Sequence, residues 1–174
     1  MQSRLMVRLL QHSALKNSAF KTQGFTLLEL LVVVVIGGIL PAIAIPSFLS
    51  RANTAKQVEA KMYLGSLNRS QQAFYAEHGR FGKSSQELGL YSQPTSNYEY
   101  QVDIPSNGSL RAVHYANSRV LKLRPYAGMV ALVKQGSVMA TVLCEAEEPA
   151  LGPATPPTAD DSSVACSPGT KALN

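Results

Sequence analysis

Hydrophobic and polar positions divide the first third of the chain into a basic segment and a long apolar one. Residues 1–24 carry four basic side chains and no acidic one, whereas no side chain from Leu30 to Ile45 is polar. About 20 apolar residues are enough to cross a bilayer as a helix, and a basic segment ahead of such a helix keeps the N-terminus on the cytoplasmic side. We therefore predict a transmembrane helix over 25–49.

The next segment is polar but keeps the periodicity of a helix over 50–78. One stripe has the spacing of a single helical face and is expected to pack on a sheet: Ala60, Tyr63, Leu64, Leu67 and Phe74. A second stripe of small and apolar side chains suits close contact with another helix, although scattered exposed apolar side chains are also common: Ala55, Val58, Met62, Gly65 and Ala73. His78 and Gly79 are typical of a helix C-terminus.

The second half of the chain has the pattern of a small antiparallel sheet. Residues 79–96 are rich in Gly, Ser, Gln and Pro and are predicted to form a loop. Turn signals at 105–109 and 134–137 indicate two hairpins within a sheet over 97–144. The expected strands are 98–104, 110–115, less clearly 120–124, then 129–133 and 138–143. The fold class is therefore α+β, with three to five strands packed on the helix.

Charge changes this picture less than the totals suggest. The chain has 16 Lys and Arg against 11 Asp and Glu, a net charge of +5, which is typical of proteins that bind nucleic acids or anionic membranes. Residues 1–24 hold four of these five charges, so the remainder is nearly neutral. A second hypothesis assigns DNA capture to the basic residues of the second half, which also suit a solvated sheet face: Arg111, His114, Arg119, Lys122 and Arg124.

Glu29 is the one carboxylate at the start of the apolar helix. A charged side chain at the centre of a bilayer costs roughly 2.5–3.5 kcal/mol, although the helix dipole lowers this cost near the N-terminus. The natural partner is an amine, and cleavage before Phe25 would create one. Residues 25 and 29 lie one helical turn apart, so the pair can form within one chain or between staggered copies.

The residues around Glu29 resemble a known signature. Lys21-Thr-Gln-Gly24-Phe25-Thr-Leu-Leu-Glu29, followed by Gly-Gly-Ile-Leu-Pro-Ala-Ile-Ala-Ile-Pro46, is similar to the prepilin signature of type IV pilins. The resemblance implies that 1–24 is a leader, that a prepilin peptidase cleaves between Gly24 and Phe25, and that Phe25 is N-methylated. It also implies that Glu29 neutralises the amine of a neighbouring subunit during assembly.

Three further segments carry the resemblance beyond the signature. Residues 59–75, together with 88–90 and 97–100, resemble pilins of the cyanobacterial type. The implied fold is the type IV pilin fold, in which a long N-terminal helix packs on a small antiparallel sheet. The implied function is that of a structural subunit in a helical filament of identical copies, used for motility, adhesion and in some cases DNA uptake.

The resemblance also implies partners and a cellular location. The precursor would lie in the inner membrane with its head in the periplasm, assembly machinery of the inner membrane would build it into a pilus, and the pilus would be extracellular. One alternative is a pseudopilin of a type II secretion system, which shares the signature. Another is a membrane-anchored periplasmic domain that keeps its leader.

Four residues make 37–46 the weakest part of the predicted helix: Gly37, Gly38, Pro41 and Pro46. A proline within a helix removes one hydrogen bond and clashes with the preceding turn, at a cost of about 3 kcal/mol in water. Pro41 departs from the family, which usually has Ala there. A kinked membrane helix would explain these residues. The resemblance favours a segment that melts on polymerisation.

Cys144 and Cys166 bound a segment rich in Pro, Ser and Thr, within a C-terminal region over 145–174. Such a segment has little to bury and does not hold a fold alone. A disulfide would close it onto the sheet, and the predicted topology places both cysteines on the oxidising side of the membrane. Type IV pilins often have a disulfide-bounded loop here, which extends the resemblance. The alternative is two unpaired thiols.

Motifs of catalysis are missing from the sequence. The three histidines lack the spacing of metal ligands, and there is no Walker loop, nucleophile elbow or Cys-x-x-Cys motif. A cluster of solvated charges explains Glu145, Glu147 and Glu148 better than a calcium site does. We therefore expect a protein that is not an enzyme and that has no cofactor and no metal.

Overall fold

The computed structural model describes residues 24–91, 94–105 and 110–173. The chain divides into two units, Met1–Ala44 and Ile45–Asn174. The predicted leader, apart from Gly24, lies outside the described residues, as does most of the predicted turn at 105–109. Helix α2 runs from Leu27 to His78 over 52 residues. It ends where Gly79 adopts a φ of 67°, a left-handed conformation that suits glycine and stops a helix.

Five antiparallel strands form the main sheet of the second unit, in the order β1-β2-β3-β4-β7. Their bounds are Tyr98–Asp103 for β1, Arg111–Ser118 for β2, Tyr126–Val133 for β3, Val138–Ala146 for β4 and Thr170–Ala172 for β7. A separate pair of short strands follows β4 in the chain, with β5 at Thr158–Ala159 and β6 at Val164–Ala165. The α+β class is confirmed. Strands β1 and β7 are the two edges of the main sheet.

One predicted strand is wrong. Residues 120–124 form a turn after β2, in which the Leu123 amide donates to the Val120 carbonyl at 3.0 Å. Leu123 is fully buried in the core beneath α2. This segment is apolar because Leu123 packs in the core from a turn, without forming a strand. The fifth strand of the sheet is instead β7, which lies within the region expected to be irregular.

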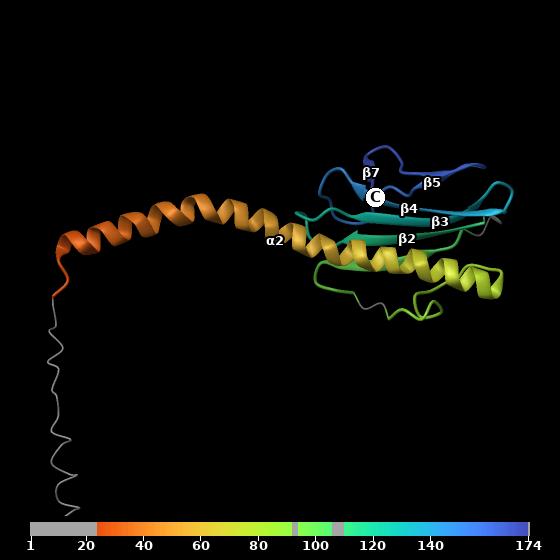
Figure 1. Ribbon diagram of the computed structural model, residues 1–174, viewed down its shortest axis with the longest axis horizontal. Coiled ribbons are helices and arrows are strands. Elements are labelled where there is room, and N and C mark those ends of the chain that lie inside the picture. The colour runs from red at the N-terminus through yellow and green to blue at the C-terminus, as the bar shows by residue number, and fades with distance from the viewer. Residues whose placement is uncertain (1–23, 92–93, 106–109, 174) are drawn as a thin grey trace, which may run out of the picture. The chain divides into compact units, whose positions relative to one another are not determined.

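The main sheet is a middle layer with a cover on each face (Figure 1). On one face lies the second half of α2, whose predicted stripe is confirmed, since Ala60, Leu64 and Leu67 are completely buried. On the other face, Val113 and Met129 pack with partly buried residues of β5 and β6. The C-terminal region therefore covers an apolar sheet face that would otherwise be exposed.

The predicted disulfide between Cys144 and Cys166 is present, with the two Cα atoms 5.7 Å apart. Cys144 is completely buried on β4, so the bridge fixes the C-terminal region to the sheet. Backbone hydrogen bonds add to this attachment. Ser118 and Gly152 exchange two at 2.9 Å, and the Lys134 amide donates to the Asp161 carbonyl at 2.6 Å.

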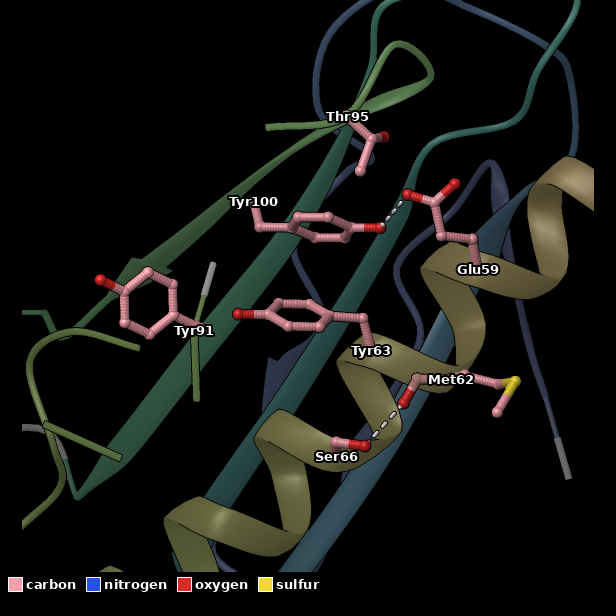
Figure 2. A pocket seen from close by; sticks show the side chains of 7 residues that line it. All are labelled: Glu59, Met62, Tyr63, Ser66, Tyr91, Thr95 and Tyr100. Atoms are coloured by element: carbon pink, nitrogen blue, oxygen red, sulfur yellow. Dashed lines mark hydrogen bonds between the residues drawn. The ribbon is translucent and has the colours of Figure 1, made fainter. Parts of the chain in front are cut away.

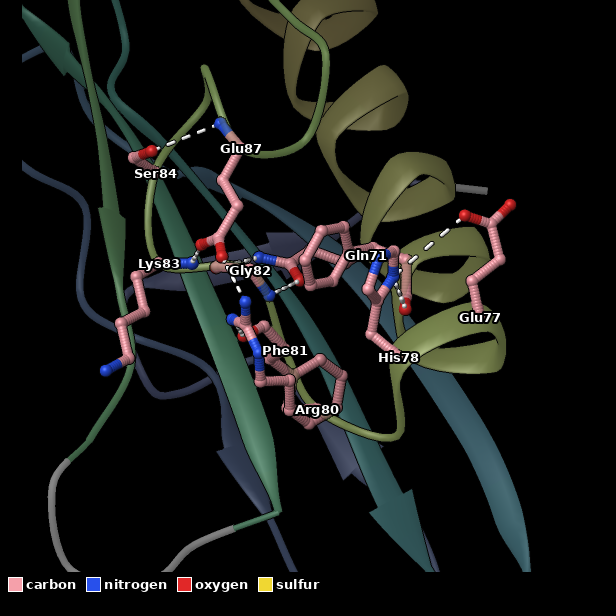
Figure 3. Close-up of polar contacts among 10 residues, drawn as sticks. Gln71, Glu77, His78, Arg80, Phe81, Gly82, Lys83, Ser84 and Glu87 are labelled. Carbon is pink, nitrogen blue, oxygen red and sulfur yellow. Dashed lines mark hydrogen bonds and ion pairs between the residues drawn. The ribbon is translucent and has the colours of Figure 1, made fainter.

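Gln71 is a buried polar residue of α2 that fixes the loop after the helix (Figure 3). Its side-chain amide donates to the Gly82 carbonyl at 2.8 Å and accepts from the Gly82 amide at 2.9 Å. A few residues on, Glu87 pairs with Arg80 and accepts from the Lys83 amide at 2.6 Å. These contacts give the 79–91 loop a fixed course although its sequence is typical of irregular structure.

Replacing Gln71 by Met should lower the free energy of unfolding by about 2 kcal/mol, because the buried backbone groups of Gly82 then lose both partners. Chemical denaturation of the full chain in detergent, followed by circular dichroism, measures this difference. The matched control is Gln72→Met, since no hydrogen bond of the Gln72 side chain is found within the described residues. Equal destabilisation of the two variants would contradict the role assigned to Gln71.

Candidate functional site

The N-terminal turn of α2 is built around Thr26. Its hydroxyl oxygen accepts from the Glu29 amide at 3.1 Å, and its carbonyl accepts from the Leu30 amide at 3.2 Å. Thr-x-x-Glu is the capping-box pattern, a local sequence signal for the start of a helix. Glu29 therefore lies in the first turn, where the positive end of the helix dipole favours a carboxylate. Phe25 precedes this turn and is 71% exposed.

The apolar surface that follows has no cover within the described chain. Every residue from Gly24 to Arg51 is exposed, including all the large apolar side chains of the predicted transmembrane segment. By length and composition α2 is able to cross a membrane, because an 18-residue window reaches a mean hydropathy of 2.7. A contiguous apolar surface of this size indicates a membrane or another copy of the helix as its environment.

Residues 37–46 are helical in the single chain. Pro41 and Pro46 have no amide hydrogen, so the carbonyls of Gly37 and Ala42 lack the donors that an uninterrupted α-helix would supply. This accords with a weak segment at Gly37, Gly38, Pro41 and Pro46. Melting was predicted for the assembled state, and it stays a prediction.

The second helical stripe is exposed in the single chain. Val58 is 45% and Met62 68% exposed, and Ala55 and Ala73 are exposed as well, while Gly65 is half-buried. Arg51 and Arg69 lie on the same side of the helix and are exposed. This outer face of α2 is therefore free to contact another helix, as the pattern suggested.

An open groove of about 500 Å³ lies beside this outer face (Figure 2). It is lined by Glu59, Met62, Tyr63, Ser66, Tyr91, Thr95 and Tyr100, and is called the tyrosine groove below. The rings of Tyr63 and Tyr100 lie 4.2 Å apart, and Tyr91 comes from the 79–91 loop with 87% of its surface exposed. The Glu59 carboxylate accepts from the Tyr100 hydroxyl at 3.1 Å and from the Asn97 amide group at 3.2 Å.

Three basic residues surround the buried carboxylate of Glu145 and form what is called the basic cluster below. Lys61 lies 3.8 Å, Arg124 3.9 Å and Lys171 3.4 Å from its oxygens, and the Tyr126 hydroxyl donates to it at 2.8 Å. Burial alone would raise the pKa of Glu145, but the Tyr126 hydrogen bond and the lysine charges outweigh it and hold the pKa below its ordinary value. The expectation of a solvated acidic group is therefore wrong for Glu145, because these cations come from distant parts of the chain.

The basic residues proposed for DNA capture do not share one surface. Arg111 and His114 differ by three positions on β2, which places them on opposite faces of the sheet. His114 is completely buried, and burial lowers its pKa to about 4, so it is neutral at physiological pH. Arg119 donates to the Thr95 carbonyl at 3.1 Å, and Arg124 belongs to the basic cluster.

Two family profiles match the chain. The family described as "Type IV pilin-like G and H" matches residues 57–167, which include the groove-lining part of α2, strands β1 to β4 of the main sheet and both cysteines. The family described as "Prokaryotic N-terminal methylation motif" matches residues 20–45, which include Gly24, Phe25 and Glu29. The first match therefore covers most of the second unit, and the second match covers the N-terminal turn and the start of the apolar segment.

Curated relatives show the same similarity. The type IV major pilin protein PilA of Myxococcus xanthus is 42% identical over 82 residues, which cover 47% of this chain and 37% of the relative. PilE1, a type IV major pilin of Neisseria gonorrhoeae, is 30% identical over a match that covers 52% of this chain and 56% of PilE1. The type II secretion system core protein G of Pectobacterium carotovorum is 30% identical over 55% of this chain and 61% of its own. The chain spans less than two thirds of each of these relatives.

Proposed function

This chain belongs to the type IV pilin-like family, whose profile matches more than half of it, and on that premise we propose that it is the structural subunit of a type IV pilus. The observation that carries the proposal is the N-terminal turn. A capped helix start presents Phe25 and Glu29 next to an uncovered apolar surface. Such a surface is stable only in a membrane or packed against other copies of the helix.

In this proposal a prepilin peptidase cleaves between Gly24 and Phe25, and Phe25 is N-methylated. The apolar part of α2 holds the precursor in the inner membrane, with the head in the periplasm, until the assembly machinery transfers it into an extracellular filament. The methylation motif at 20–45 supports the processing step. The relationship to cyanobacterial pilins stays a prediction, as do motility, adhesion and DNA uptake by the filament.

A role in type II secretion is the second candidate, because three of the relatives are core proteins of such systems. The larger identity to a major pilin favours the pilus. The location of the assembly separates the two functions. Fibres released from cells by shear indicate a pilus, whereas short assemblies confined to the periplasm indicate secretion. A membrane-anchored periplasmic domain would form neither and would keep its leader.

Mass spectrometry of sheared fibres tests the proposal directly. We expect the N-terminal peptide of the filament subunit to begin at Phe25 and to carry one methyl group on its amine. A chain that still begins at Met1 in cells with an active prepilin peptidase would overturn the proposal.

Replacing Glu29 by Gln should reduce the yield of sheared fibres by at least about tenfold, because the charge that pairs with the amine of the neighbouring subunit is lost in an apolar surrounding. The amount of precursor in the membrane should stay the same, since Gln also tolerates the first helical turn. Quantitative immunoblots of the sheared and membrane fractions measure both amounts. Glu147→Gln, at an exposed position, is the control, and equal fibre yields for the two variants would contradict this role of Glu29.

A further inference from the structure

The head carries two surfaces of opposite charge at opposite edges of the main sheet. The tyrosine groove includes Tyr100 on β1, which is one edge strand, and the basic cluster includes Lys171 on β7, which is the other. Helix α2 contributes Glu59 to the tyrosine groove and Lys61 to the basic cluster. Two residues correspond to about 200° around a helix, so these side chains leave α2 on opposite flanks.

The tyrosine groove has the chemistry of a site for a basic side chain. Within the described chain no basic group lies within 4 Å of the Glu59 carboxylate, and the buried Tyr63 hydroxyl has no hydrogen-bond partner. The ring of Tyr91 and the side chain of Met62 stand open to solvent beside them. Aromatic faces next to a carboxylate attract an ammonium or guanidinium group through both charge and cation–π interaction.

The basic cluster has an excess of positive charge, which is complementary to the carboxylate of the tyrosine groove. Its three cations share the single carboxylate of Glu145. Lys171 is the most exposed of them, with 52% of its side chain accessible, against 34% for Lys61 and 31% for Arg124. Ammonium and guanidinium groups have several donors each, and only part of this capacity is used by Glu145. The cluster therefore presents free donors and positive charge at the β7 edge.

We propose that the tyrosine groove of one copy receives the basic cluster of a second copy of this chain. The inference rests on the proposed function, in which all copies insert into one membrane with the same orientation. In a helical filament, each copy is related to the next by a rotation about the filament axis and a translation along it, so neighbouring copies contact each other through two different surfaces. Such a contact can repeat along the filament without closing into a ring. A chain with an acidic aromatic groove at one edge and a basic cluster at the other fits this arrangement.

The outer face of α2 is continuous with the groove and limits where the second copy can lie. Met62 belongs to the outer face and also lines the groove. A neighbouring helix that packs on Val58 and Met62 therefore brings its own flank to the mouth of the groove. The contact between heads extends the contact between helices instead of competing with it.

Cross-linking within intact fibres tests the contact. Tyr91, which is 87% exposed, is replaced by the photoreactive residue p-benzoylphenylalanine, fibres are sheared and irradiated, and cross-linked peptides are identified by mass spectrometry. We expect dimers in which position 91 is joined to peptides around Lys61, Arg124 or Lys171 of a second copy. The same probe at Leu151, an exposed position outside both surfaces, is the control. No dimer from position 91, or the same cross-links from both positions, would overturn the contact.

A charge test uses variants that keep the size of each side chain. Glu59→Gln and Lys171→Gln should each reduce fibre yield by about tenfold at physiological salt, as expected for a close interfacial charge pair. The double variant should lose little more than either single one, because the two side chains act on the same contact. Glu99→Gln, an exposed neighbour on β1, should leave the yield unchanged. Thermal unfolding of each full chain in detergent shows that the variants are folded.

The outcomes separate this inference from the proposed function. If wild-type fibres begin at Phe25 but Glu59→Gln behaves like Glu99→Gln, or the losses of the two single variants simply add, the contact is wrong and the pilus function stands. If the wild-type chain forms no fibres, the proposed function fails and the inference fails with it.

Discussion

Replacing Cys144 and Cys166 together by Ala is expected to lower the free energy of unfolding by about 3 kcal/mol, as estimated for a bridge that closes a loop of this length. The segment between them contributes few buried residues, so without the bridge it remains attached mainly through β7 and a few backbone hydrogen bonds. Urea denaturation of the full chain in detergent, followed by circular dichroism, measures the change.

Reduction provides an independent check of the same quantity. Wild-type protein denatured in the presence of a thiol reductant should unfold at the urea concentration of the double variant, and the double variant should not respond to the reductant. A loss below about 1 kcal/mol would mean that the β4–β7 pairing and the packing on the outer sheet face hold this region without the bridge.

The second large effect is expected at His114. Both of its ring nitrogens are buried without a hydrogen-bond partner in the described chain, and its strand neighbours are Val102 and Gly128. Burial lowers the pKa of His114 to about 4, whereas an unfolded chain binds the proton near its ordinary value of about 6.5. The unfolded state therefore binds more protons between these two values. Stability should fall by about 3 kcal/mol as the pH is lowered from 6.5 to 4.

The His114→Leu variant isolates this contribution. Leucine fills a similar volume and leaves no unpaired nitrogen, so we expect higher stability at neutral pH by about 1 kcal/mol and no loss from this site between pH 6.5 and 4. The difference between variant and wild type should grow across this window, while the carboxylates titrate in both proteins. The exposed His78 serves as the control through His78→Leu. A constant difference over the window would contradict a neutral, buried His114.

The main architecture could be predicted because it depends on patterns of residues that are close together in the sequence. The apolar run before Leu49 and the helical stripe around Leu64 each determine an element without reference to distant residues. Strand β7 had no comparable signal, because Thr170–Ala172 is three residues long and pairs with the end of β4. At residues 120–124 a strand was predicted where none exists, because the apolar Leu123 packs in the core from a turn.

The candidate site also has a part that could be predicted from the sequence and a part that could not. Phe25 and Glu29 belong to one contiguous signature, and the Thr-x-x-Glu capping pattern could have located the start of the helix as well. The tyrosine groove and the basic cluster are assembled from helix, loop and sheet, so neither has a sequence pattern of its own. Glu145 shows the physical limit most clearly, because the cations that stabilise its burial are far away in the chain.

The middle-layer sheet has a consequence for how this protein can change over time. The C-terminal cover touches the outer face through few side chains, chiefly Ala154, Ala159 and Val164, and is otherwise held by the disulfide and by backbone hydrogen bonds, which any side chain permits. Substitutions at most of its exposed positions therefore leave the core and the α2 face untouched. Outside β7, which carries Lys171, the cover can diversify in shape and charge while the surfaces proposed to join one copy to the next stay under constraint.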